Sequence, residues 1–224
     1  MPPEEEPPAR LPAEAMTTWL VTPAPLTEGR RAKHALVEAT RRLINAVMQL
    51  AVDPLEGDGV AAVTALGSEV SSVSARVAAL PRLRGSADDG GDDARLLERS
   101  GITGAGNPLS PPLHLEVRGD RVVGWAEYAR QYEGPPGCVH GGFVAAAFDD
   151  LLGAAQTLSG TAGFTGTLTI RMVRPTPLLR RIDYEGGVTG VEGRKILTWG
   201  RARSRGDVVA EANGVFIAPR PDLR

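Results

Sequence analysis

The sequence predicts an α+β fold in which a curled antiparallel β-sheet holds one central helix. Residues 143–158 read as a single helix that is Ala-rich and apolar nearly all round, so it must be covered on most sides. The segments before and after it are short, rich in β-branched residues or alternating in polarity, and joined by Gly-containing turns. Consecutive hairpins of this kind form an antiparallel sheet, and the sheet has to wrap the helix.

Composition excludes several classes of protein. The chain has 224 residues, 42% of them hydrophobic and 23% charged, which is ordinary for one sizeable globular domain with an appendage. A formal net charge of -2 gives no field that would recruit nucleic acid or an acidic membrane surface. No apolar run approaches the ~20 residues that span a bilayer, and the start of the chain is acidic and Pro-rich, unlike a targeting peptide. With a single cysteine, Cys138, we expect a cytoplasmic protein without disulfide, metal or other cofactor.

The first hundred residues divide into three predicted parts. Seven prolines make residues 1–26 a tail. Residues 27–84 carry two apolar stripes at helical spacing, separated by Asp53-Pro54 and Gly57, and predict a helical hairpin. The Gly- and Asp-rich residues 85–98 form a linker to a domain over 99–224.

Within that domain the predicted order is β-β-α-β-β-β-β. Gly119-Asp120, Gly193 and Gly206-Asp207 provide hairpin turns. The predicted strands cover residues 113–117, 122–128, 164–173, 182–191, 195–203 and 208–217.

Two acidic residues stand out on the central helix. Asp149 and Asp150 are the only polar residues between Phe143 and Ala155. A carboxylate on a buried helix costs several kcal/mol unless it is paired or hydrogen-bonded, and both lie too far along to benefit from the helix N-terminus. One of them can sit on a wet helix edge or pair with an arginine, but two together indicate that this helix uses a carboxylate.

The start of the helix supplies complementary hydrogen-bond donors. Gly141 and Gly142 leave backbone N–H groups accessible at the positive end of the helix, where a carbonyl oxygen can become an oxyanion. A plain tight turn is the alternative for this pair of glycines. The donors and Asp149 lie ~12 Å apart along the axis, so they meet on one substrate only if two copies of the helix pack antiparallel.

These residues resemble a known family. Gly134-Pro135-Pro136-Gly137-x-x-His140-Gly141-Gly142 followed by Asp149 is similar to the hotdog-fold acyl-CoA thioesterases of the phenylacetate-pathway type, and most of all to the mitochondrial long-chain acyl-CoA subgroup. Further similarity lies at Thr165, at Arg174-Pro175-x-Pro177-Leu178 and at Val191–Lys195, and covers about residues 105–218. Many relatives carry Asn six residues before the His, where this chain has Gly134.

The resemblance implies a role for each matching residue. Asp149 matches the carboxylate that acts as general base on water or attacks the thioester directly. Gly142, with Gly141 beside it, matches the oxyanion donor, and His140 matches a residue that shapes the turn. Thr165 matches a hydroxyl near the carboxylate, with an ordinary strand start as the alternative.

Three basic residues match positions that contact coenzyme A. Arg194 and Lys195 match the residues that hold its phosphates, and Arg171 lies where a further contact is expected. Solvated strand ends are the alternative for all three. The resemblance also implies an acyl-CoA substrate and a homodimer or dimer of dimers.

We therefore expect hydrolysis of a fatty or aryl acyl-CoA to free acid and CoA. The alternative is a non-catalytic acyl-CoA-binding or regulatory hotdog protein. A hotdog hydratase is disfavoured, because Ala154 stands where those enzymes carry a His. A Cys138–His140 nucleophile pair is disfavoured because no third group accompanies it. Candidates for the acyl-chain tunnel are Phe143, Phe148, Leu152 and Trp199.

Overall fold

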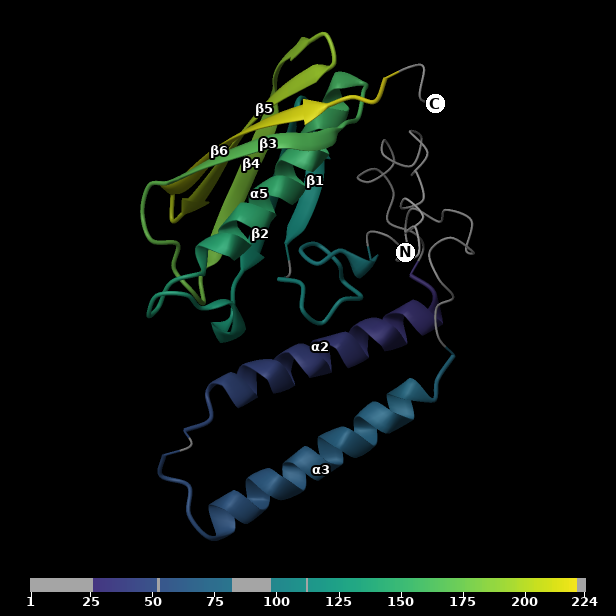
Figure 1. Cartoon of the computed structure of the whole chain (residues 1–224), viewed down its shortest axis with the longest axis vertical. Coiled ribbons are helices and arrows are strands. Elements are labelled where there is room, and N and C mark those ends of the chain that lie inside the picture. The colour runs from purple at the N-terminus through teal and green to yellow at the C-terminus, as the bar shows by residue number, and fades with distance from the viewer. Residues whose placement is uncertain (1–25, 52, 82–97, 112, 221–224) are drawn as a thin grey trace, which may run out of the picture.

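The computed structural model describes residues 26–51, 53–81, 98–111 and 113–220. The predicted tail and linker therefore lie almost wholly outside the described residues. Figure 1 shows a sheet with one helix against its concave face and two further helices to one side.

The described strands form one six-stranded sheet in which every neighbouring pair is antiparallel, in the order β1-β2-β4-β5-β6-β3. Gly119, Gly193 and Gly206 have φ of 63°, 58° and 88°, and each closes a tight hairpin in the left-handed region that glycine adopts without strain. The strands are β1 (His114–Arg118), β2 (Arg121–Glu127), β3 (Phe164–Met172), β4 (Arg181–Glu192), β5 (Lys195–Ser204) and β6 (Asp207–Ile217). Their bounds lie within two residues of those predicted from the sequence.

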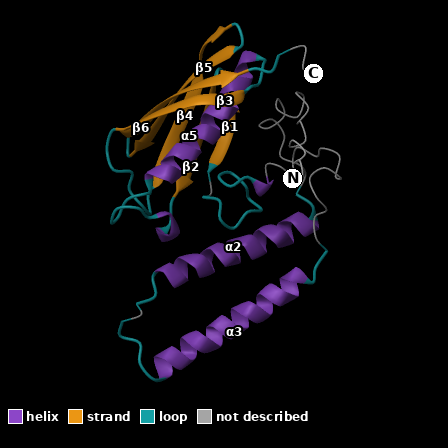
Figure 2. Cartoon of the chain, in the orientation of Figure 1, coloured by secondary structure: helices purple, strands orange, loops and turns teal. Residues whose placement is uncertain are grey.

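The central helix α5 (Gly141–Gln156) lies in the curve of the sheet and contacts β2, β3, β4, β5 and β6 (Figure 2). Its inner side chains, among them Phe148, Leu151 and Leu152, are fully buried. Glycines in the sheet allow this close approach, since a Cβ added at Gly200 would lie 3.0 Å from Leu152 Cδ2 and 3.1 Å from Phe148 Cδ1. The predicted α+β fold with a wrapped helix is confirmed.

The two N-terminal helices form the predicted pair, and only the first is bound closely to the sheet domain. The helix α2 (Glu28–Met48) carries His34, whose Nε2 lies 2.9 Å from Glu98 Oε1. Arg41 on the same helix donates to the carbonyls of Gly104 and Asn107 at 3.1 and 2.7 Å. The helix α3 (Asp58–Ala78) lies beyond α2 from the sheet (Figure 1) and buries none of its residues. None of the described helices has both the length and the apolarity to cross a membrane.

One acidic side chain fastens the start of the domain to the central helix. Asp150 Oδ2 accepts hydrogen bonds from the hydroxyls of Ser100 and Thr103 at 3.2 and 3.1 Å. Burial raises the pKa of Asp150; these two hydroxyls oppose that rise, and the neighbouring charge of Asp149 adds to it. The cost expected for a carboxylate on this helix therefore falls on Asp150, because Asp149 is exposed in the single chain.

The raised pKa of Asp150 predicts how stability depends on pH. The folded chain holds this proton more tightly than the unfolded chain, so the contribution of Asp150 to stability falls as pH rises from the usual Asp range through the raised pKa. Asp150→Asn keeps an oxygen for the hydroxyls and removes the charge. The free energy of unfolding of the variant should therefore increase relative to that of wild type between about pH 4 and pH 7, so that the variant becomes the more stable of the two by a growing margin.

Urea unfolding at the two pH values measures this difference, with the exposed Asp53→Asn as a matched control. A difference between Asp150→Asn and wild type that does not change with pH would contradict the assignment.

Candidate active site

The start of α5 presents two backbone N–H groups in different states. His140 is the N-cap residue, and its Nδ1 accepts a hydrogen bond from the Gly142 N–H at 3.0 Å. The preceding loop is held in place by the His140 N–H, which donates to the Tyr132 carbonyl at 2.8 Å. The Gly141 N–H makes no hydrogen bond with any described residue. Of the two predicted oxyanion donors, one is thus open and the other is occupied by the His140 ring.

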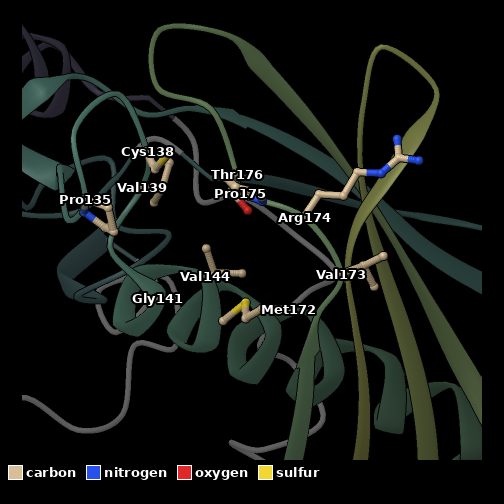
Figure 3. A pocket seen from close by; sticks show the side chains of 10 residues that line it. All are labelled: Pro135, Cys138, Val139, Gly141, Val144, Met172, Val173, Arg174, Pro175 and Thr176. Carbon is tan, nitrogen blue, oxygen red and sulfur yellow. The ribbon is translucent and has the colours of Figure 1, made fainter.

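A groove of about 390 Å³ opens beside Gly141 (Figure 3). Val144 of α5 and Met172 at the end of β3 lie close together on one side of it, and Cys138 lies across from them (Figure 3). The Arg174 side chain points away from the groove, and its Nη1 lies 3.0 Å from Asp207 Oδ2. The groove is thus mostly apolar. Its lining residues are Pro135, Cys138, Val139, Gly141, Val144, Met172, Val173, Arg174, Pro175 and Thr176.

Asp149 lies on the outer face of α5, next to the first residues of the edge strand β3. The Thr165 hydroxyl donates to Asp149 Oδ1 at 3.0 Å. Both side chains are exposed in the single chain. The hydroxyl that the family resemblance places near the carboxylate therefore lies in hydrogen-bonding contact with it. The second carboxylate oxygen makes no hydrogen bond to the described residues.

The two halves of the predicted site lie at the start and in the middle of one helix. Gly141 and Asp149 are eight residues apart on α5, which is ~12 Å along its axis. A Cβ at Gly141 would touch Met172 at the end of β3, whereas Asp149 bonds Thr165 at its start. Within one chain the open donor and the carboxylate do not converge.

No described residue covers the face that carries both halves. β3 is an edge strand of the sheet, and seven of its nine residues are exposed. Gly141, Gly142 and Asp149 on the adjoining face of α5 are exposed as well. An edge strand with unpaired backbone groups is a ready surface for pairing with another chain.

The three basic residues predicted to contact CoA fall into two groups. Arg171 on β3 lies across from Glu211, with 3.9 Å between Nε and Oε2. Arg194 Nε donates to the Ala218 carbonyl at 2.8 Å, and Lys195 lies across from Ile217. The positions opposite them, Glu211 and Ile217, are six residues apart on β6, a span of about 20 Å. The two groups therefore lie near opposite halves of the site, Arg171 toward Gly141 and the other pair toward Asp149.

The expected tunnel residues do not line the groove. Phe148 and Leu152 are fully buried in the core, and Phe143 packs edge-on against Tyr132 with ring centroids 4.9 Å apart. Trp199 covers Gly187, whose added Cβ would lie 3.0 Å from the indole nitrogen. The sequence did not identify Val144 and Met172 as residues that line the groove. Helical periodicity shows which positions are apolar, but not which of them lies beside a loop or strand end.

Cys138 and His140 do not form a nucleophile pair. The Cys138 thiol lies 3.6 Å from the Pro136 carbonyl, and the His140 Nδ1 is engaged by Gly142. Among the described residues no group of three His, Cys, Asp or Glu side chains is placed to hold a metal ion.

The fold and this site define a hotdog protein whose functional groups lie along the exposed face of its central helix. No family model matches the chain. A crystal structure of a thioesterase superfamily protein superposes with a TM-score of 0.69 at 31% sequence identity, and the match covers 83% of this chain and 94% of that one. The chain belongs to the thioesterase superfamily.

Two curated relatives agree with this assignment over a shorter segment. Acyl-coenzyme A thioesterase THEM4 of Xenopus laevis is 36% identical over 87 residues, which are 38% of this chain and 39% of that protein. Acyl-coenzyme A thioesterase THEM5 of Homo sapiens is 33% identical over 87 residues, covering 38% and 35%. The chain thus aligns with about two fifths or less of the length of these relatives.

The cap at His140 gives a prediction that does not depend on activity. His140→Ala removes the acceptor for the Gly142 N–H and should lower the free energy of unfolding by ~1 kcal/mol, a typical N-cap contribution. His140→Asn keeps an acceptor of similar reach and should retain most of that stability. Urea unfolding of the two variants measures it, and equal losses in both would show that the ring contributes something other than the cap.

Proposed function

We propose that the protein hydrolyses an acyl-CoA thioester to the free fatty or aryl acid and CoA, with residues 99–224 as the catalytic domain. The observation that carries the proposal is the carboxylate of Asp149, which is exposed, accepts a hydrogen bond from Thr165 and has a second oxygen that no described residue engages. An open N–H at Gly141 beside an apolar groove supplies the complementary half. The two curated relatives, which are named acyl-CoA thioesterases, support the same chemistry, and the single cysteine suits a cytoplasmic enzyme.

The proposed reaction assigns each group one task. The thioester carbonyl oxygen accepts hydrogen bonds from the N–H groups of Gly141 and Gly142, which requires the His140 ring to release Gly142. Asp149 takes a proton from water as the water oxygen bonds to the carbonyl carbon, or its carboxylate attacks that carbon itself. Thr165 holds one carboxylate oxygen and so aims the other. The C–S bond then breaks, and the CoA thiolate leaves and takes up a proton. On the second route the acyl group is left on Asp149 as an anhydride, which water hydrolyses to the free acid and the Asp149 carboxylate.

We propose that the active unit is a homodimer, alone or within a dimer of dimers, whose sites are shared between chains. Antiparallel packing of two α5 helices brings Gly141 and Gly142 of one chain close to Asp149 and Thr165 of the other. Within one chain these groups cannot converge, because they lie ~12 Å apart along the helix. The uncovered face of α5 and β3 supports this arrangement. The same packing unites Arg171 of the first chain with the basic pair of the second at one CoA molecule.

A second candidate is a non-catalytic acyl-CoA-binding protein. It is favoured by one observation, the bond from the Gly142 N–H to His140, which leaves a single open donor for a carbonyl oxygen. Hydrolysis assays over a short panel of acyl-CoA chain lengths separate the two functions. Release of free CoA supports the hydrolase, and binding without release supports the alternative.

The proposal predicts a large loss of rate in Asp149→Asn. The variant keeps the size of the side chain and its hydrogen bond to Thr165 but lacks a base, so kcat should fall by ~10²–10⁴. Affinity for a non-hydrolysable acyl-CoA analogue should change little. Stability should also change little, because Asp149 is exposed.

Asp150→Asn is the matched control for this variant. Asp150 faces Ser100 and Thr103 rather than the exposed side of α5, so its loss should have a much smaller effect on kcat. A dead Asp150→Asn beside an active Asp149→Asn would assign the chemistry to the wrong carboxylate. Full activity in both variants would refute hydrolysis by this site.

The basic pair at the β4–β5 turn should affect binding rather than chemistry. The variant Arg194→Ala/Lys195→Ala removes two cations that we propose to face the CoA phosphates, so KM for acyl-CoA should rise with kcat little changed. The dependence of KM on salt should flatten, because exposed charges are screened by salt. Arg205→Ala, in the β5–β6 turn at the other end of β5, is a control for loss of surface charge. An unchanged KM at low salt would contradict the assignment.

A further inference from the structure

The helix α3 carries an apolar face that covers no other part of the described chain. Within the described residues α3 makes no close packing with α2 or with the sheet, and it forms the edge of the molecule (Figure 1). Its aliphatic side chains are 36–58% exposed. An exposed apolar face of this length is typical of an interaction surface.

The spacing of that face is the heptad spacing of a coiled coil. Six aliphatic residues follow one another in steps of three, four, three, four and three, so they repeat every 3.5 residues and not every 3.6. Val63, Val70 and Val77 occupy one of the two seam positions, a. The other position, d, holds Leu66 and Val73, and Leu80 continues the spacing two residues beyond the last helical residue, Ala78. Such a repeat fits a second helix that runs along the same seam.

Under antiparallel pairing the seam of α3 matches itself. A two-fold axis between residues 71 and 72 faces Val63 with Leu80, Leu66 with Val77, and Val70 with Val73 of a second copy. Every layer then joins an a position to a d position, as antiparallel helix pairs require. All six aliphatic side chains are covered, and none faces a polar group.

The charges beside the seam agree with the same register. Glu69 and Arg76 occupy the flanking position g, and neither makes a hydrogen bond or ion pair within the described part of the chain. The antiparallel register places Glu69 of one copy opposite Arg76 of the other, twice by symmetry. The other flank pairs Gly67 with Ser74, which are small and uncharged. A parallel pair would instead place Glu69 opposite Ser74 and form no ion pair.

Two other surfaces fit this face less well. The exposed stripe of α2 at Leu43 and Val47 is flanked by Ala39 and Ala46, which offer no partner for Glu69 and Arg76. A membrane-surface helix has basic residues along its polar face, whereas Arg76 is the single cation of α3.

We propose that α3 is a self-association helix that pairs antiparallel with α3 of a second copy of this chain. The contact is separate from the proposed sharing of active sites through α5, and it does not depend on the proposed activity. It gives the N-terminal helices a role in assembly.

Cysteine cross-linking in the full chain tests the register directly. In a Cys138→Ser background, chains with Val70→Cys and with Val73→Cys carry different tags and are expressed together. Oxidation should join the two tags by a disulfide, because these positions face each other in one layer. The pair Ser68→Cys and Ala75→Cys lies on the opposite side of α3 and should give little product.

Charge reversal provides an independent readout. Glu69→Arg and Arg76→Glu should each reduce the yield of the 70–73 cross-link several-fold, because each creates two like-charge pairs. The combined swap Glu69→Arg/Arg76→Glu restores opposite charges and should restore the yield.

Four results would overturn the proposal, and the first three concern the pattern of products. They are equal cross-linking at 68–75 and 70–73, cross-linking of Val70→Cys chiefly to itself as in a parallel pair, and single charge reversals without effect. Absence of any product between chains would overturn it as well, since the two facing positions could not then meet.

Discussion

The length of α5 is the constraint on which the site depends. Eight residues of helix hold the open N–H of Gly141 ~12 Å from the carboxylate of Asp149, and a helix buried along one side cannot bend to close that gap. The edge strand β3 runs beside α5 in the opposite direction and keeps the same separation, with Met172 near Gly141 and Thr165 bonded to Asp149. A single chain therefore holds the two groups apart, and this separation, rather than any one residue, supports the proposal of a shared site.

The position of the sheet explains why the groups of both half-sites remain accessible on the surface of the chain. It covers α5 on the side of Phe148, Leu151 and Leu152, with glycines such as Gly200 allowing close contact. What it leaves open is the side of Gly141, Gly142 and Asp149, next to the edge strand β3. Asp150 points instead to the start of the domain, where Ser100 and Thr103 satisfy it. The two adjacent carboxylates therefore have different roles. Asp150 holds the start of the domain against α5, and Asp149 faces the space that a second chain would fill.

Local patterns made the fold predictable, and contacts distant in sequence limited the prediction of the site. Turn glycines at 119, 193 and 206 and the apolar helix predicted the element order, and the family resemblance implied that Thr165 lies near Asp149. Neither signal could show that Asp150 would be held by residues 100–103, or that His140 would cap Gly142. The groove was missed for the same reason, since Val144 and Met172 come together only through the packing of α5 against β3.

The shared site is tested most directly by pairing two inactive chains. Asp149→Asn removes the carboxylate, and Gly141→Leu fills the groove beside the open donor at a position where an added Cβ meets only Met172 Cε at 3.6 Å. The two chains, with different tags, are expressed together, and the mixed dimer is purified and assayed for acyl-CoA hydrolysis. One site of the mixed dimer carries both changes and the other carries none, so about half of the wild-type activity should return. Mixed dimers as inactive as their parents would contradict a site shared between chains.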